Sequence, residues 1–113
     1  MKTNLTAGVI GLGVGESHII GYDSHASCSV TKLCDLSKDV LKSVGCRHPE
    51  KQLTSKPDDI ICDPDIDIVS IASYDDYHKD QVIASLLNGK HVFVEKPLCL
   101  DNKELTSIVK IMR

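Results

Sequence analysis

The chain has 113 residues, of which 42% are hydrophobic and 26% charged, and its 13 Lys and Arg against 16 Asp and Glu give a formal net charge of −3. A chain of this length can bury roughly 65% of its unfolded surface, enough for a core without disulfides. The acidic balance argues against nucleic-acid or anionic-membrane partners, which need clustered Lys and Arg. No apolar run approaches the roughly 20 residues that cross a bilayer, and we expect no export signal.

The cysteines form an odd number and contain no Cys-x-x-Cys pair; they are Cys28, Cys34, Cys46, Cys62 and Cys99. Without an export signal, we interpret them as reduced thiols of a cytoplasmic protein. Asp63, Asp65 and Asp67 imitate the start of a calcium loop, but the later glycine and glutamate of that loop are missing. No His and Cys residues have zinc-site spacing, so the sequence predicts no metal site.

The first half of the chain alternates strand and helix patterns. In chain order we expect a strand over 7–10, a helix over 16–25, a strand over 29–34, a helix between 37 and 45, a strand over 52–54 and a short helix after 57. A glycine cluster separates the first strand from its helix. Ser37 has the chemistry of a helix N-cap, and Gly45 suits the position after a helix end.

The second half continues the alternation. A nearly continuous apolar run over 66–72 is typical of a strand covered on both faces. A helix that stops at Gly89 follows, then a strand over 91–94, and Asp101 with Glu104 forms a capping box for a last helix. Strands and helices joined by short links predict a doubly wound parallel α/β sheet, a Rossmann fold, as a single domain over 1–113.

The glycine cluster lies where a dinucleotide pyrophosphate binds in such folds. Gly11 permits the tight turn, and Gly13 lets backbone N–H groups approach the phosphates at the helix N-terminus. The usual G-x-G-x-x-G pattern has glycine or alanine where this chain has Glu16, and Gly15 comes one residue early. A tight turn without a ligand therefore stays open as an alternative.

Asp35 strengthens the cofactor hypothesis. It ends the second predicted strand about 20 residues past the glycines, where a carboxylate accepts hydrogen bonds from the adenosine ribose hydroxyls. A carboxylate there repels a 2′-phosphate, so NAD is favoured over NADP, although Ser37 and Lys38 lie close enough to bind a phosphate. Asp35 could also serve as an acid at a helix N-terminus, and the two roles are compatible.

Several stretches resemble one family of proteins. They are Val9 to Gly13, His18, Cys34-Asp35, Asp65 to Ala72, His78 and Asn88 to Leu98. The most specific stretch is Gly89-Lys90-His91-Val92-x-x-Glu95-Lys96-Pro97. On these residues the chain resembles the amino-terminal part of the Gfo/Idh/MocA family of nicotinamide-dependent oxidoreductases, which takes its name from glucose–fructose oxidoreductase, inositol dehydrogenase and rhizopine catabolism.

The resemblance implies roles for individual residues. Lys96 corresponds to the family's catalytic lysine, which lies beside the nicotinamide and contacts the substrate hydroxyl or carbonyl. Glu95 corresponds to the residue that reaches the nicotinamide ribose, and Ser73 offers a hydroxyl to the cofactor. The expected cofactor-binding set is Gly11, Gly13, Val14, Gly15, Asp35, Ser73 and Glu95. The family's Pro-Asn-x-x-His loop is changed here to Tyr74-Asp75-Asp76-Tyr77-His78, and we interpret His78 as structural.

Family members also carry a second domain, with the substrate pocket, after a helix like the last one predicted here. We therefore expect this chain to bind NAD without turning over substrate alone. The longer protein would transfer hydride between NAD(P) and a secondary alcohol or ketone of a sugar, polyol or sugar nucleotide. The isolated domain is expected to be a monomer or weak dimer. The alternative is a non-catalytic nucleotide-binding sensor or partner module.

Overall fold

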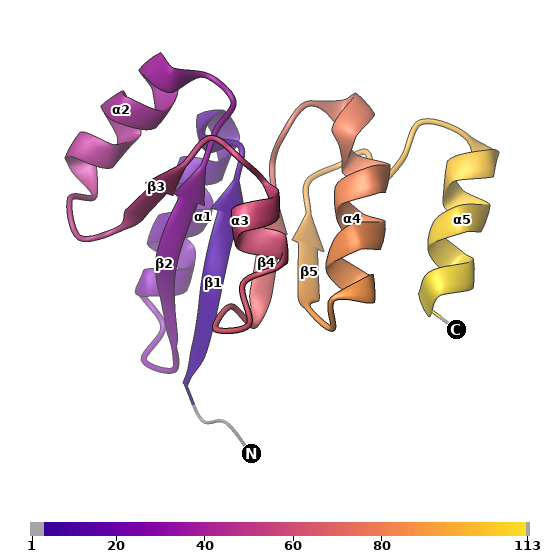
Figure 1. The fold of residues 1–113 in the computed structure, drawn as a ribbon, viewed down its shortest axis with the longest axis horizontal. Helices are drawn as coiled ribbons and strands as arrows, with labels where there is room; N and C mark the ends of the chain where they lie inside the picture. Colours follow the sequence, from indigo (N-terminus) through magenta and orange to yellow (C-terminus); the bar gives the residue numbers. More distant parts are fainter. Residues whose placement is uncertain (1–3, 113) are drawn as a thin grey trace.

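A five-stranded parallel sheet organises the protein (Figure 1), of which the computed structural model describes residues 4–112. The strands are β1 (Leu5–Ile10), β2 (Cys28–Cys34), β3 (Gln52–Thr54), β4 (Ile68–Ile71) and β5 (His91–Val94). Their order across the sheet is β3-β2-β1-β4-β5, and every neighbouring pair is parallel. The doubly wound α/β fold predicted from the strand–helix alternation is confirmed.

Helices connect the strands and lie on both faces of the sheet (Figure 1). They are α1 (Leu12–Asp23), α2 (Lys38–Arg47), α3 (Asp58–Ile61), the 3₁₀ turn η1 (Asp75–Tyr77), α4 (His78–Leu87) and α5 (Asn102–Met112). Within residues 4–112, no helix is both long enough and apolar enough to cross a membrane.

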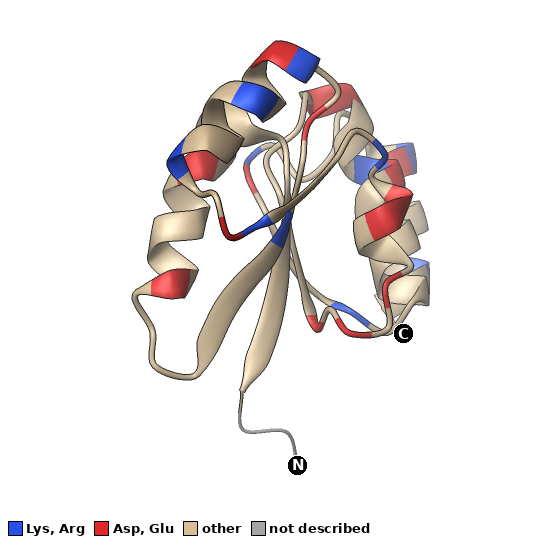
Figure 2. Cartoon of the chain, turned by 60° about the vertical axis from the view of Figure 1, so that its left-hand side comes forward, with Lys and Arg blue, Asp and Glu red and all other residues tan. Residues whose placement is uncertain are grey.

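Two apolar layers, one on each face of the sheet, form the core. The α1–α2 layer consists of Ala7, Val9, Leu12, Ile19, Val30, Leu33 and Val44. The opposite layer, under α3, α4 and α5, consists of Ile10, Cys34, Ile60, Ile61, Ile66, Val69, Ile71, Val82 and Ile108. Figure 2 shows the sheet between the two sets of helices, with few charged residues on its strands. Because successive strand side chains point to opposite faces, each central strand contributes to both layers.

The sheet order reverses direction at β1. From β1 the chain first adds β2 and β3 on one side, and later adds β4 and β5 on the other. The helices that leave the carboxyl ends of β1 and β4 therefore cross opposite faces of the sheet. This reversal opens a crevice at the carboxyl ends of these two strands, where ligands bind in open α/β folds.

Helix α1 begins earlier than the sequence predicts. It starts at Leu12 rather than Glu16 and ends at Asp23 rather than His25, so the glycine cluster forms its first turn. Gly11, with φ of 89°, is the N-cap. The weak helix propensity of glycine is overridden by packing, because a Cβ on Gly15 would lie only 2.8 Å from Cγ1 of Val9.

The end of α2 also differs from the prediction. Gly45 lies inside this helix, which runs to Arg47 and has His48 as its C-cap. Gly45 is buried because Leu53 of β3 packs on it: a Cβ there would lie 2.6 Å from Cδ1 of Leu53. The predicted start is confirmed, since Oγ of Ser37 accepts a hydrogen bond from the amide N of Val40 at 3.3 Å.

Two other helix-end predictions are confirmed. Gly89 has φ of 72° directly after α4, a conformation that favours glycine. At the start of α5, Asp101 accepts a hydrogen bond from the amide of Glu104 at 2.9 Å. The Glu104 carboxylate in turn accepts one from the amide of Leu100 at 2.8 Å, one residue before the position expected in a capping box.

The tight contact at Gly8 predicts a difference between two glycine substitutions. A Cβ on Gly8 would lie 2.5 Å from Cγ2 of Ile60, whereas one on Gly21 of α1 would meet no atom within 4 Å. We expect Gly8→Ala to destabilise the protein by about 1–3 kcal/mol through overpacking. Gly21→Ala should stabilise it by about 0.5–1 kcal/mol through helix propensity. Denaturant unfolding measures both, and equal stabilities of the two variants would contradict the packing described here.

Candidate functional site

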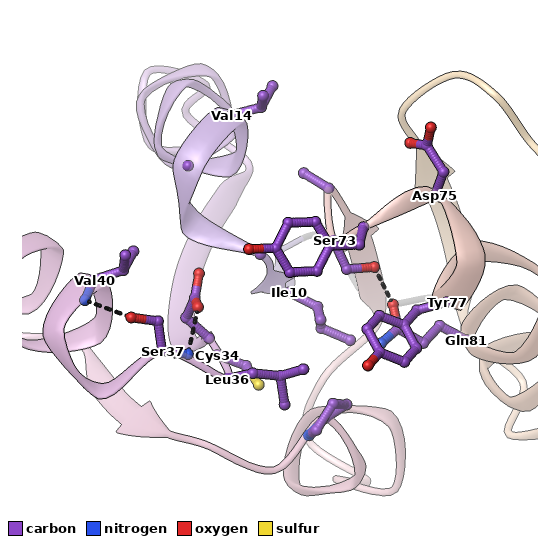
Figure 3. Close-up of a pocket in the computed structure, with 16 residues that line it drawn as sticks. Ile10, Val14, Cys34, Leu36, Ser37, Val40, Ser73, Asp75, Tyr77 and Gln81 are labelled. Atoms are coloured by element: carbon purple, nitrogen blue, oxygen red, sulfur yellow. Dashed lines mark hydrogen bonds between the residues drawn. The ribbon is translucent and has the colours of Figure 1, made fainter.

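A cavity of about 300 Å³ lies at the carboxyl ends of β1, β2 and β4. Figure 3 shows Cys34, Leu36 and Ser37 on one side of it and Ser73, Asp75, Tyr77 and Gln81 on the other. Gly11, Gly13, Val14 and Asp35 also line it. The cavity therefore occupies the crevice at the sheet's reversal point, and five of the predicted cofactor-binding residues, Ser73 among them, line it.

The glycine turn leaves room for a ligand at the N-terminus of α1. A Cβ on Gly11 would lie 2.5 Å from the backbone of Ala72 and Ser73, so only glycine fits. At Gly13, by contrast, a Cβ would meet nothing within 4 Å, and this residue faces the cavity. The N–H groups in the first turn of an α-helix have no acceptor within the helix, and the helix dipole favours an anion there. The turn can accommodate a phosphate group.

The Asp35 carboxylate joins the end of β2 to this turn. Its Oδ2 accepts a hydrogen bond from the amide of Leu12 at 2.9 Å, and its Oδ1 accepts one from the amide of Ser37 at 2.8 Å. The Asp35 carboxylate thus accepts hydrogen bonds at the N-termini of two helices, α1 and α2. Each carboxylate oxygen can accept more than one hydrogen bond, so the carboxylate retains capacity for the hydroxyl groups of a ligand in the cavity.

Glu16, which breaks the usual glycine pattern, does not line the cavity. Its carboxylate receives hydrogen bonds from Nε and Nη2 of Arg47 at 2.7 and 2.8 Å, and Nε2 of His48 lies 3.2 Å away. The hydrogen bond from Arg47 lowers the pKa of Glu16. The side chain is therefore held toward the end of α2. Gly15, one residue earlier, supplies the close approach between helix and strand that the third glycine of the pattern normally provides.

On the β4 side of the cavity, Ser73 and Gln81 form a polar pair. The Ser73 hydroxyl donates to Oε1 of Gln81 at 2.6 Å (Figure 3). Ser73 therefore lines the cavity, and its hydroxyl hydrogen already has Gln81 as an acceptor. On the cavity floor, burial and the nearby Asp35 charge raise the pKa of the Cys34 thiol to about 12, so this thiol stays neutral.

Glu95 and Lys96 lie outside the cavity, past the carboxyl end of β5. The Glu95 amide donates to the carbonyl oxygen of Ile71 at 2.9 Å, which continues the pairing of β5 with β4. Lys96 is exposed, and within residues 4–112 its ammonium has no hydrogen bond or ion pair. The predicted catalytic Lys96 and the predicted cofactor-binding Glu95 are thus on the β4–β5 side of the crevice. The glycine turn and Asp35 are on the β1–β2 side.

Two histidines hold the segment around Lys96. His18 lies within hydrogen-bond distance of Glu95, and His78, only 1% exposed, lies between two backbone carbonyls. Its Nδ1 is 2.6 Å from the oxygen of Pro97 and its Nε2 is 2.9 Å from that of Ser73. This placement agrees with the structural role predicted for His78. The sequence did not reveal these contacts, because they join residues up to 77 positions apart.

An elongated ligand with an anionic centre and hydroxyl groups fits this arrangement. The N–H groups of the glycine turn could donate to the anionic centre. The Asp35 carboxylate could accept from hydroxyl groups on one side, and the Glu95 carboxylate from hydroxyl groups on the other. A dinucleotide has these features in this order.

Comparison with known proteins agrees with this geometry. The chain is 38% identical over 95 residues to an inositol 2-dehydrogenase/D-chiro-inositol 3-dehydrogenase of Shouchella clausii, a match that covers 80% of this chain and 27% of that protein. It is 30% identical over 104 residues to a myo-inositol 2-dehydrogenase of Thermotoga maritima, covering 91% of this chain and 31% of that protein. The chain thus spans about a third or less of the length of these relatives.

A solved structure shares the fold. The myo-inositol 2-dehydrogenase of Lactobacillus plantarum superposes with a TM-score of 0.87 at 27% identity, over 96% of this chain and 33% of that one. The family model described as "Oxidoreductase family, NAD-binding Rossmann fold" matches residues 5–113. The match covers nearly the whole sequence and includes the glycine turn, Asp35 and the Glu95-Lys96-Pro97 segment. The chain therefore belongs to the Gfo/Idh/MocA oxidoreductase family and corresponds to its NAD-binding Rossmann fold.

Proposed function

We propose that this chain is the cofactor-binding domain of an NAD-dependent oxidoreductase that acts on a secondary alcohol or the corresponding ketone. The observation that carries the proposal is the cavity at the reversal point of the sheet, where an open glycine turn and a carboxylate at the end of β2 face the same space. NAD, when bound, supplies the hydride acceptor. The chain's own residues bind and orient it.

The contacts of the adenosine half follow from the geometry. The free N–H groups of the first turn of α1, at Gly13 and Val14, would donate to the pyrophosphate. Asp35 would accept hydrogen bonds from the adenosine ribose hydroxyls, and its negative charge would repel a 2′-phosphate. This repulsion is the reason to propose NAD rather than NADP. Ser73 would contact the cofactor from the opposite wall of the cavity.

Lys96 is the proposed catalytic residue. Its ammonium is exposed and unpaired within the described part of the chain, so it is available to a substrate. A substrate that covers it would remove water, which disfavours the charged form and makes the ammonium a better proton donor. Its positive charge would also stabilise a developing alkoxide on the substrate carbon–oxygen bond. Glu95, which directly precedes Lys96, would bind the nicotinamide ribose.

The substrate class is proposed from the relatives. Those named above are inositol dehydrogenases, so we propose a sugar or polyol, with a sugar nucleotide as a further member of the same class. The chain spans only about a third of these proteins, and the substrate pocket is proposed to lie in a second domain. We further propose that the 113-residue chain is a single cytoplasmic domain, a monomer or weak dimer, that binds NAD without turnover.

Titration with NADH and NADPH, read by cofactor fluorescence, tests the proposed site directly. We expect NADH to bind more tightly than NADPH. Asp35→Ala should weaken NADH binding by roughly 1.5–3 kcal/mol, about 10- to 150-fold, because charge-assisted hydrogen bonds are lost. Since Asp35 also holds two backbone amides, the variant's unfolding is measured alongside. Asp39→Ala, which removes an exposed carboxylate outside the cavity, is the matched control. Unchanged NADH affinity in Asp35→Ala would reject the assignment.

A second titration tests whether Glu16 affects the phosphate turn. Because its carboxylate is held by Arg47, we expect Glu16→Ala to leave NADH affinity within about twofold of the parent, near the effect of a weak exposed ion pair. Arg47→Ala, which releases the same ion pair from the other partner, should give a similar result. A large gain of NADH affinity in Glu16→Ala alone would show that the carboxylate interferes with the pyrophosphate.

Lys96→Ala separates binding from catalysis. Because the Lys96 ammonium is proposed to contact the substrate, we expect the NADH affinity of the chain to change by less than about twofold, well below the effect of losing a charged hydrogen bond. Assays of the chain with a panel of sugars and polyols should detect no NAD reduction. Measurable turnover by the 113-residue chain would contradict the proposal that a second domain is required.

A further inference from the structure

His18 links the interior of the sheet to the carboxylate of Glu95. Its side chain is only 8% exposed, and it has a polar partner on each side. Nδ1 lies 2.6 Å from Oγ of Ser70, which is fully buried, and Nε2 lies 2.7 Å from Oε1 of Glu95. The hydroxyl of Tyr22 donates to the same Ser70 oxygen at 3.3 Å. Four residues from three parts of the fold thus form one continuous chain of contacts.

The alternation of side chains brings these residues together. His18 and Tyr22 are four residues apart on α1, so they lie on the same side of that helix. On β4, Val69 and Ile71 belong to the opposite layer, which directs Ser70 toward α1. Phe93 of β5 lies on the α1 side too, with its ring at 5.1 Å and nearly perpendicular to the His18 ring. Glu95, two residues after Phe93, continues on the same side.

The contacts allow a consistent direction for the hydrogen bonds. If the Tyr22 hydroxyl donates to Ser70, the Ser70 hydroxyl can donate to Nδ1 of His18. Nε2–H of a neutral imidazole then donates to Glu95, and every donor has an acceptor. In this pattern Nε2 of His18 carries the proton that the Glu95 carboxylate accepts.

We propose that His18 is a positioning residue that fixes the Glu95 carboxylate for a ligand with vicinal hydroxyl groups. With Oε1 held by His18, Oε2 of this half-exposed side chain stays available for the ligand. The proposal rests on the proposed function, in which that ligand group is the nicotinamide ribose. Glu95 directly precedes Lys96, whose ammonium has no contact of its own in residues 4–112, so fixing Glu95 also restricts the position of the lysine.

Comparing NADH with AMP tests this role, because AMP has an adenosine ribose and a phosphate but lacks the nicotinamide half. We expect His18→Leu to weaken NADH binding by about fivefold to twentyfold and to leave AMP binding unchanged. This loss is at the lower end of that for a direct hydrogen bond to a charged group, because Glu95 itself remains. His18→Gln, whose amide can place an N–H donor near the position of Nε2, should restore most of the NADH affinity. His91→Gln, an exposed histidine at the other end of β5, is the matched control.

A double variant shows whether the effect passes through Glu95. In a Glu95→Ala background, His18→Leu should cause no further loss of NADH affinity, because the carboxylate that it positions is gone. If His18→Leu binds NADH as tightly as the parent, the inference is wrong. Equal losses for NADH and AMP would also contradict it, since they would indicate general damage to the fold. Binding of neither ligand by the parent would instead contradict the proposed function, and this inference with it.

An NMR measurement on the parent chain is independent of affinity. Long-range ¹H–¹⁵N spectra of the histidine rings report which nitrogen carries the proton. We expect Nε2 of His18 to carry a proton, because it faces the Glu95 carboxylate. A proton on Nδ1 alone would require His18 to accept from Glu95, which an ionised carboxylate cannot provide, and would overturn the inference.

Discussion

The central strands of the sheet have apolar layers on both faces, and this constraint determines where the polar groups of the site lie. Side chains of β1 and β4 must alternate between the α1–α2 layer and the opposite layer. Ser70 is the polar exception on β4, and its position on the α1 side is what allows His18 to enter between the helix and the sheet. The reversal of strand order at β1 then places the cavity between the two sets of helices.

Besides the sheet and its two apolar layers, the site depends on a few side chains that join separate helices and strands. Asp35 joins β2 to the first turn of α1 and to the start of α2, and these hydrogen bonds hold the glycine turn in place without a ligand. Such preorganisation reduces the ordering cost of binding. On the other side of the crevice, His18 and His78 hold the residues on either side of Lys96. Within residues 4–112, the Lys96 ammonium itself has no hydrogen bond or ion pair.

How far the sequence predicts the structure depends on the distance between interacting residues. The Ser37 cap, the Asp101 capping box and the stop at Gly89 are local patterns, and the structure confirms them. The start of α1 and the place of Gly45 depend on packing against Val9 and Leu53, which a helix-propensity argument does not include. The links of His18 and the ion pair of Glu16 also cross between elements, and a strand-parity argument at Ser70 is the one signal that could have suggested the former.

The buried ring of His78 has a consequence for the local dynamics of the protein. Moving the Glu95–Pro97 segment away from α4 would expose this imidazole and separate its Nδ1 from the carbonyl oxygen of Pro97. The Glu95 amide is also part of the pairing with β4. We therefore expect the segment to open together with the β4–α4 unit rather than to fray as a surface loop, and the Glu95 amide to exchange hydrogen as slowly as those of the sheet.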